Sequence, residues 1–254
     1  MSVDRTISVR SAINRAWAGL LDPDAIRIGM GFDVATTLKK KGKGGNQSNP
    51  SAICVLQQVG LMFLSRLFVR FRTNDPKIAA AIIEAILADI AAARPLLRVR
   101  KLCVDATNER FFAANLKSEF AGRLIVEPVV GSEGMEYRGL KMTMKAYLGN
   151  QLVDHVEDGY FAMPELAWLQ SDFRLVKRVA ESFDAEIDEH GNHGDCFDAA
   201  KLALHALVHG GGPAEARAAA VGSYAKAPGT QPGRKLFNQF AHLHRRGGGI
   251  RRPV

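Results

Sequence analysis

Acidic residues open or close three expected elements that lie far apart in the sequence: Asp33, Asp105 and the pair Asp195 and Asp198. Carboxylates at element ends can meet at one edge of a sheet. Their hard oxygen atoms suit Mg²⁺ and Mn²⁺. Two such ions, held about 4 Å apart, can generate the hydroxide that attacks a phosphodiester and stabilise the leaving oxygen. The acids therefore predict a site for two divalent cations that hydrolyses phosphodiesters.

Each acid also has a purely structural interpretation. Asp195 is a natural N-cap, and an acid in a first helical turn interacts favourably with the helix dipole. Asp105 could simply end a strand. Asp33 is the hardest to explain in this way, because an acid in a strand, on the face that carries Gly29 and Gly31, is otherwise costly. Asp195 and Asp198 are three residues apart and can share a helical face, so either could be the third ligand, with Asp195 preferred because it stands at the turn.

Two further residues could assist the acids. Glu109 follows Asp105 by four residues and either joins the site or faces solvent. His193 precedes Asp195 by two residues and either binds metal or phosphate or is an ordinary loop histidine. We treat both as auxiliary candidates, and the predicted catalytic set is Asp33, Asp105 and Asp195.

The elements that must position these acids follow from hydrophobic periodicity. Residues 26–35 alternate, with large apolar side chains on one face and Gly29, Gly31 and Asp33 on the other, which predicts a strand. The other expected strands are 52–58, 61–71, 99–105, 124–129, a short strand after the turn at 157–159, and a hairpin within 174–190. The expected helices are 5–21, a long helix opened by residues 74–76, 108–120, 141–148, 164–173 and 195–208. Three consecutive antiparallel strands followed by α/β units predict an α/β fold with a mixed sheet flanked by helices.

Charge indicates a polyanionic partner. The formal net charge is +8, and residues 216–254 contain eight Lys or Arg and no Asp or Glu. A second basic cluster, Lys39, Lys40, Lys41 and Lys43, lies in a Gly-rich segment and is a candidate DNA-binding loop. Both segments could equally be solvated surface.

The chain divides into three expected parts. Residues 1–24 form an N-terminal helix or linker, residues 25–209 the folded domain, and residues 210–254 a basic tail. Three scattered cysteines and the lack of a long apolar run favour a reducing cytoplasm and exclude a membrane partner.

Four short motifs in this order carry a resemblance to a known family: GFDVA at 31–35, VDATNERF at 104–111, EDGYFAMP at 157–164 and HGDCFDAA at 193–200. Together they resemble the C-terminal nuclease domain of tailed-bacteriophage terminase large subunits, which has an RNase H-like fold. The resemblance covers residues 25–209. It implies an endonuclease that cuts double-stranded DNA during genome packaging with two Mg²⁺ or Mn²⁺ ions. It also implies that Asp33, Asp105 and Asp195 or Asp198 bind the metals.

The resemblance further implies partners and a setting. These are double-stranded DNA, an ATPase domain, the portal and the small terminase subunit, in the cytoplasm of an infected or lysogenic bacterial host. The sequence departs from the family because it holds no P-loop motif. The chain is therefore expected to be an isolated nuclease domain or a stand-alone relative.

Other functions remain open on the sequence alone. A different RNase H-like nuclease, of the Holliday-junction resolvase or RNase H type, would use the same acids. A non-catalytic DNA-binding module of the same fold would use them only as caps and turns. The basic tail could also dock a capsid or portal protein instead of DNA.

Overall fold

The computed structural model describes most of the chain. The described residues are 15–24, 27–36, 38–41, 45–48, 50–180, 182–189 and 193–209, with residues 38–41 and 45–48 described by their backbone alone. Lys43 and residues 216–254, expected to contact DNA, lie outside this part of the chain. None of the helices in the described ranges combines the length and the apolarity needed to span a membrane.

A six-stranded mixed sheet forms the centre of the fold, in the order β10-β5-β4-β1-β6-β7. Its strands are β1 (Arg27–Asp33), β4 (Ser51–Val59), β5 (Met62–Phe71), β6 (Val99–Asp105), β7 (Val126–Val129) and β10 (Phe161–Ala162). Strands β1, β4 and β5 pair antiparallel, whereas β6 runs parallel to β1, β7 parallel to β6 and β10 parallel to β5. The expected α/β fold with a mixed sheet is thus confirmed.

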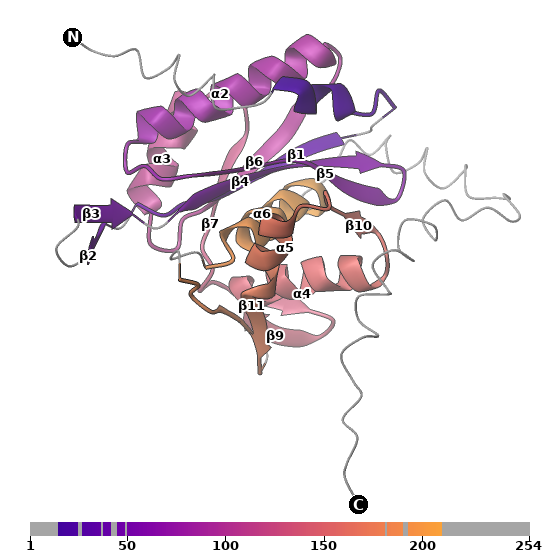
Figure 1. The fold of residues 1–254 in the computed structure, drawn as a ribbon. Helices are drawn as coiled ribbons and strands as arrows, with labels where there is room; N and C mark the ends of the chain where they lie inside the picture. The colour runs from indigo at the N-terminus through magenta and orange to yellow at the C-terminus, as the bar shows by residue number, and fades with distance from the viewer. Residues whose placement is uncertain are drawn as a thin grey trace, which may run out of the picture.

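Helices cover both faces of the sheet (Figure 1). On one face lie the 3-10 helix η1 (Arg15–Leu20), α2 (Pro76–Ala93) and α3 (Arg110–Glu119). On the other lie α4 (Met144–Glu157), α5 (Ala167–Arg174) and α6 (Asp195–Val208). The sheet is therefore the middle of three layers, and its two faces build separate cores.

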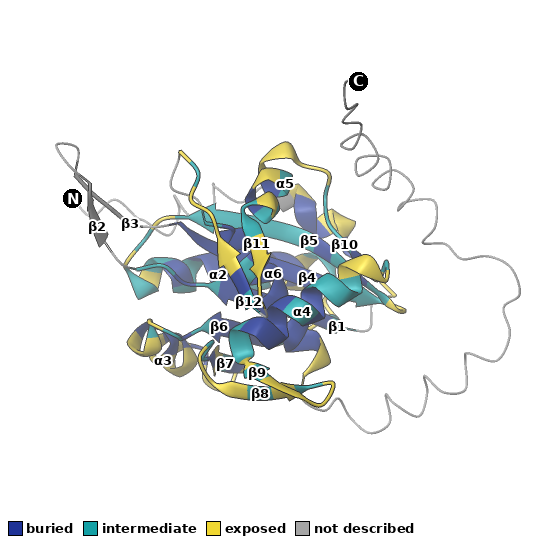
Figure 2. Cartoon of the chain, turned by 90° about the horizontal axis from the view of Figure 1, so that it is seen from below, coloured by how far each residue is buried: buried dark blue, intermediate teal, exposed yellow. Residues whose placement is uncertain are grey.

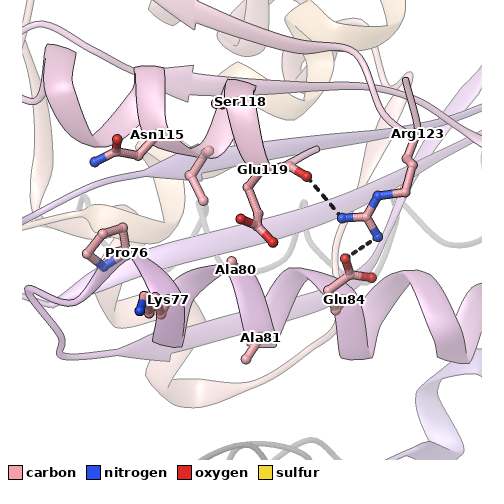
Figure 3. A pocket seen from close by; sticks show the side chains of 10 residues that line it. Pro76, Lys77, Ala80, Ala81, Glu84, Asn115, Ser118, Glu119 and Arg123 are labelled. Carbon is pink, nitrogen blue, oxygen red and sulfur yellow. Dashed lines mark hydrogen bonds and ion pairs between the residues drawn. The ribbon is translucent and has the colours of Figure 1, made fainter. Parts of the chain in front are cut away.

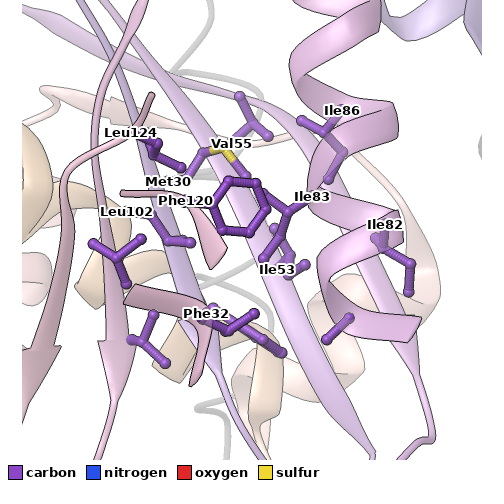
Figure 4. Packing of buried hydrophobic residues seen from close by; sticks show 14 of the residues in the cluster. Met30, Phe32, Ile53, Val55, Ile82, Ile83, Ile86, Leu102, Phe120 and Leu124 are labelled. Atoms are coloured by element: carbon purple, nitrogen blue, oxygen red, sulfur yellow. The ribbon is translucent and has the colours of Figure 1, made fainter. Parts of the chain in front are cut away.

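The first core packs the large side chains of the central strands against α2 and α3. Met30 and Phe32 of β1 meet Ile83 of α2 and Phe120 at the end of α3, and all four are almost fully buried (Figure 4). Helix α2 begins where expected, because Asp75 caps it by accepting a hydrogen bond from Lys77 N and Pro76 follows at its first position.

The second core is built around α6, which is buried along most of its length (Figure 2). Opposite it, β1 presents glycines. A Cβ atom on Gly31 would lie 2.1 Å from the carbonyl oxygen of Ala199 and 2.3 Å from Ala203 N. On Gly29 it would lie 2.8 Å from Leu207 Cγ. The bare face of β1 thus lets the backbone of α6 lie directly on the strand.

In the described part of the chain, three hairpins lie outside the main sheet: β2 (Leu38–Lys41) with β3 (Gly45–Ser48), β8 (Gly134–Tyr137) with β9 (Leu140–Thr143), and β11 (Val176–Val179) with β12 (Ser182–Ala185). The expected hairpin within 174–190 is confirmed. The expected helix 141–148 was placed wrongly, because residues 141–143 belong to β9. Thr143 instead caps α4 by accepting a hydrogen bond from Ala146 N, and the helix continues to Glu157.

Candidate metal centre

Asp33 and Asp105 end neighbouring parallel strands in equivalent positions. In the β1–β6 pairing Phe32 is aligned with Val104, so the two acids are the next residues on each strand. Parallel strands place their carboxyl ends at the same edge of a sheet, and residues in register point to the same face. Both acids therefore lie at one edge, on the face that α6 covers.

Helix α6 brings its acids to the same edge. Gly29 of β1 lies against Ala203 and Leu207, and Gly31 lies against Ala199. Helix α6 therefore runs antiparallel to β1, so residues nearer the carboxyl end of β1 contact residues nearer the N-terminus of α6. The next residue on this face is Asp33, and the first turn of α6 lies opposite it.

Electrostatics show that the acids are close enough to interact. Loss of contact with water raises the pKa of Asp33 well above its ordinary value, and Asp198, Asp105 and Asp195 raise it further, in that order. Lys201 acts in the opposite direction. The cluster thus carries more negative charge than the protein neutralises well, which is a feature of carboxylates that bind cations.

A hollow of about 450 Å³ opens beside two of the acids. Its lining includes Asp105 of β6 and Asp198 of α6, with Lys145 and Lys201 as basic groups and several small polar side chains. Asp195 is not among the lining residues. The structure therefore places Asp198, rather than Asp195, on the same hollow as Asp105.

One oxygen of each of these two carboxylates is held by the protein. Asp105 Oδ1 accepts hydrogen bonds from Thr107 N at 2.8 Å and from Thr107 Oγ1 at 2.6 Å. The same hydroxyl accepts a hydrogen bond from Gly131 N at 2.8 Å, which links Asp105 to the loop after β7. Asp198 Oδ1 accepts a hydrogen bond from Lys201 Nζ at 2.5 Å. Thr107 and Lys201 were missed from the sequence, although the Asp-x-Thr turn and the i, i+3 spacing were readable signals.

Asp195 lies in a different environment. It is 4% exposed, and its Oδ2 has no hydrogen-bond partner among the described residues. Burial, chiefly, and the neighbouring Asp172 raise the pKa of Asp195 to about 7. Asp172 itself pairs with Arg70 at 3.2 Å and accepts a hydrogen bond from Cys196 N at 2.8 Å. Asp172 thus caps α6 from another helix, which no local sequence signal predicts.

The pKa of Asp195 predicts a pH dependence of stability in the absence of divalent cations. A carboxyl group whose pKa is raised on folding stabilises the native state fully only below its unfolded pKa, and this contribution is lost as the pH rises through the folded value. We expect the free energy of unfolding in EDTA to fall between about pH 4 and pH 7 relative to Asp195→Asn. Urea titrations of both proteins across this range measure it. Parallel curves would contradict the prediction.

The auxiliary candidates are placed as follows. Glu109 Oε1 accepts a hydrogen bond from Thr36 N at 3.3 Å, just beyond β1, so its carboxylate lies at the same edge as Asp33. His193 contributes a backbone hydrogen bond that lowers the pKa of Asp195. In the basic cluster, Lys39, Lys40 and Lys41 belong to strand β2, and their side chains, like the whole of Lys43, lie outside the described residues.

A larger hollow, of about 790 Å³, lies between α2 and α3 on the opposite face of the sheet (Figure 3). Its rim is closed by an ion pair of Arg123 with Glu84, and Arg123 also donates a hydrogen bond to the carbonyl oxygen of Glu119. These groups neutralise each other. The four acids that could bind cations lie on the other side of the sheet, so the smaller hollow is the candidate site.

Comparisons with known proteins found similarity among solved structures alone. No family model and no curated protein matches the sequence. Solved structures do match. In fold, the chain is similar to terminase nuclease domains. The large terminase nuclease from the thermophilic phage G20c is 19% identical, with 72% of this chain and 83% of that chain covered and a TM-score of 0.49.

Two further structures show the same likeness. The human cytomegalovirus terminase nuclease domain is 12% identical, with 81% of this chain and 94% of that chain covered and a TM-score of 0.47. The g2p (large terminase) nuclease domain from bacteriophage SPP1, solved with bound Mn, is 14% identical, with 76% and 91% covered and a TM-score of 0.40. At TM-scores below 0.5 and identities this low, the likeness carries no argument about this chain. What this chain does must be argued from its own acids.

The acids suit divalent cations by donor type and by charge. All four supply hard oxygen atoms, and the buried Oδ2 of Asp195 has no partner within the described ranges. In the described part of the chain, no three His, Cys, Asp or Glu side chains already stand in a metal-holding geometry.

Proposed function

We propose that this chain is a metal-dependent endonuclease that cuts double-stranded DNA, and that it acts as the nuclease part of a phage DNA-packaging terminase. The observation that carries the proposal is the convergence of Asp33, Asp105 and Asp198 from three elements at one edge of the sheet, beside a hollow. Acids that serve only as caps need not gather around one carboxyl group, whereas Asp198, Asp105 and Asp195 all lie near enough to Asp33 to raise its pKa. The likeness in fold to terminase nuclease domains is consistent with the setting.

The roles of the residues follow from their positions. Asp33, Asp105 and Asp198 would hold the cations, with Asp195 buried behind them and Glu109 at the same edge of the sheet. Cations bound there would stabilise the negative charge that develops when water adds across a bridging P–O bond of DNA.

The chain's own groups prepare this site. Thr107 holds Asp105 in one orientation and ties it to Gly131, so the carboxylate is preorganised before the substrate arrives. Lys145 and Lys201 on the wall of the hollow supply positive charge for the DNA backbone. The basic cluster and tail would add affinity without reading sequence.

The first test is cleavage of supercoiled and linear plasmid in Mn²⁺, Mg²⁺ or EDTA. We expect cutting only with the metals, and a loss of about a hundredfold or more in Asp105→Asn and Asp198→Asn, because each removes a ligand charge. Glu84→Gln is the matched control, since its carboxylate lies in the α2–α3 hollow (Figure 3). Intact plasmid in every lane, with unchanged DNA binding, would favour the non-catalytic module.

Asp198→Asn and Asp195→Asn test which of the two acids is the third metal ligand. If Asp198 binds the cation directly and Asp195 does not, Asp198→Asn should weaken Mn²⁺ binding in calorimetry more than Asp195→Asn does. The reverse order would restore the preference for Asp195 that the sequence suggested. Branched DNA and an RNA–DNA hybrid belong in the same assay, because faster cutting of either than of duplex DNA would assign the chain to a resolvase-type or RNase H-type activity.

A further inference from the structure

A lysine occupies the acid cluster itself. Lys201 lies one turn after Asp198 on α6, is 6% exposed, and donates a hydrogen bond to Asp198 Oδ1 at 2.5 Å. It lines the same hollow as Asp105, and its charge lowers the pKa of Asp33. One ammonium group thus interacts with acids from two of the three elements that form the site.

Because Lys201 is buried, its ammonium group depends on the acids of this site for its charge partners. Lysine is rarely buried unless it is paired, because removing an ammonium ion from water is costly. Asp198 and Asp33 offset this cost for Lys201, and Lys201 in turn offsets part of the repulsion between these acids. A divalent cation bound by Asp198 would meet the ammonium group at close range, and two like charges at this distance repel strongly in a partly buried site.

We propose that Lys201 is the built-in counter-ion of the acid cluster: it occupies Asp198 while the site holds no divalent cation and competes with the cation for that carboxylate. This inference rests on the proposed metal site. A cation on Asp198 repels Nζ and weakens or breaks its bond to Oδ1, and the ammonium group remains at the hollow, where the phosphate backbone of a nucleic acid can accept its hydrogen bonds. Lys201 therefore weakens binding of the metal alone and couples it to binding of the substrate.

The chain contains a matched control. Lys101 of β6 is also 6% exposed and also pairs with a carboxylate, Glu127, at 2.6 Å. It lies on the same face of the sheet but four residues before Asp105, and does not line the hollow. Lys201→Met and Lys101→Met each remove a buried ammonium group and leave an acid behind, so a general effect of losing a buried ion pair should appear in both.

The experiment measures Mn²⁺ binding by calorimetry at roughly neutral pH. It also measures the melting temperature of each protein in EDTA and in Mn²⁺. We expect Lys201→Met to bind Mn²⁺ at least about fivefold more tightly than the wild type, the lower end of ordinary coupling between sites. Lys101→Met should bind like the wild type. In EDTA, both variants should have a lower melting temperature than the wild type. Mn²⁺ should raise the melting temperature of Lys201→Met by more than that of Lys101→Met.

The outcomes separate this inference from the proposed function. Lys201→Arg keeps the charge and should retain wild-type affinity for Mn²⁺. If the wild type binds no Mn²⁺, the metal site itself is wrong. If the wild type binds Mn²⁺ but Lys201→Met binds it equally or more weakly, Lys201 is not a competitor and this inference alone is overturned. If Lys201→Met does not fold, Lys201→Gln takes its place with the same expected direction.

Discussion

Replacing Asp33 by Asn is expected to abolish cleavage and, in EDTA, to make the protein more stable. Asp33 has a raised pKa because it is half-buried and other acids lie near it. At neutral pH its charge therefore destabilises the native state relative to the unfolded chain. The amide removes that charge with little change of shape, and it also removes a ligand for the cations.

The expected sizes differ for the two effects. Cleavage should fall by about a thousandfold or more, because each ligand of a catalytic cation supports several kcal/mol of charge stabilisation. The free energy of unfolding in EDTA at neutral pH should rise, because the amide replaces a carboxyl group whose raised pKa opposes folding at this pH. The rise should disappear below about pH 4, where the carboxyl group is protonated in both states.

Plasmid cleavage and urea unfolding of the same preparations measure both effects. Adding Mn²⁺ should close the stability gap, because a bound cation stabilises only the charged site of the wild type. Asp158→Asn is the control, since Asp158 is exposed at the end of α4. If Asp33→Asn is inactive and also less stable than the wild type in EDTA, Asp33 stabilises the fold. Its charge would then not be held at a cost to stability for the sake of binding cations.

Replacing Gly31 by Ala is expected to damage both the fold and the site. The new Cβ would lie 2.1 Å from the carbonyl oxygen of Ala199 and 2.3 Å from Ala203 N, and both are backbone atoms of α6 that cannot rotate away. The helix must move off β1. We expect a loss of about 3 kcal/mol or more of stability, at the upper end of overpacking effects. Asp198 moves with the helix, and a shift of about 1 Å in a catalytic group can cost a hundredfold in rate.

Two other glycines test whether the loss of stability depends on the space around the new Cβ atom. Gly29→Ala should be milder, because its nearest neighbour would be the side-chain atom Leu207 Cγ at 2.8 Å. Gly134→Ala in β8 has no atom within 4 Å of the new Cβ and should change stability by less than about 0.5 kcal/mol. Chemical denaturation and cleavage rates of the three variants measure the order. Equal stability of all three would show that α6 does not rest on the glycine face of β1.

Much of the fold could be predicted from local patterns in the sequence. Alternation in 26–35 indicated a strand with one bare face, and the cap Asp75 with Pro76 marked the start of α2. The order of strands and helices was enough for a mixed sheet, because parallel and antiparallel connections leave different spacings. The start of α4 was misplaced because the residues before Thr143 form a hairpin strand, and a short run of apolar and basic residues fits either element.

The sequence by itself determined which acids were candidates and that β1 carries a bare face. It could not decide between Asp195 and Asp198, since three residues on a helix subtend a small angle and either can face a sheet. Only the tertiary structure places the two acids in different environments. It turns Asp198 toward the hollow with Asp105 and Lys201, and it buries Asp195 near Asp172 from α5. The physical reason is that burial, pairing and pKa depend on groups brought together from distant parts of the chain, whereas sequence spacing fixes only neighbours along one element.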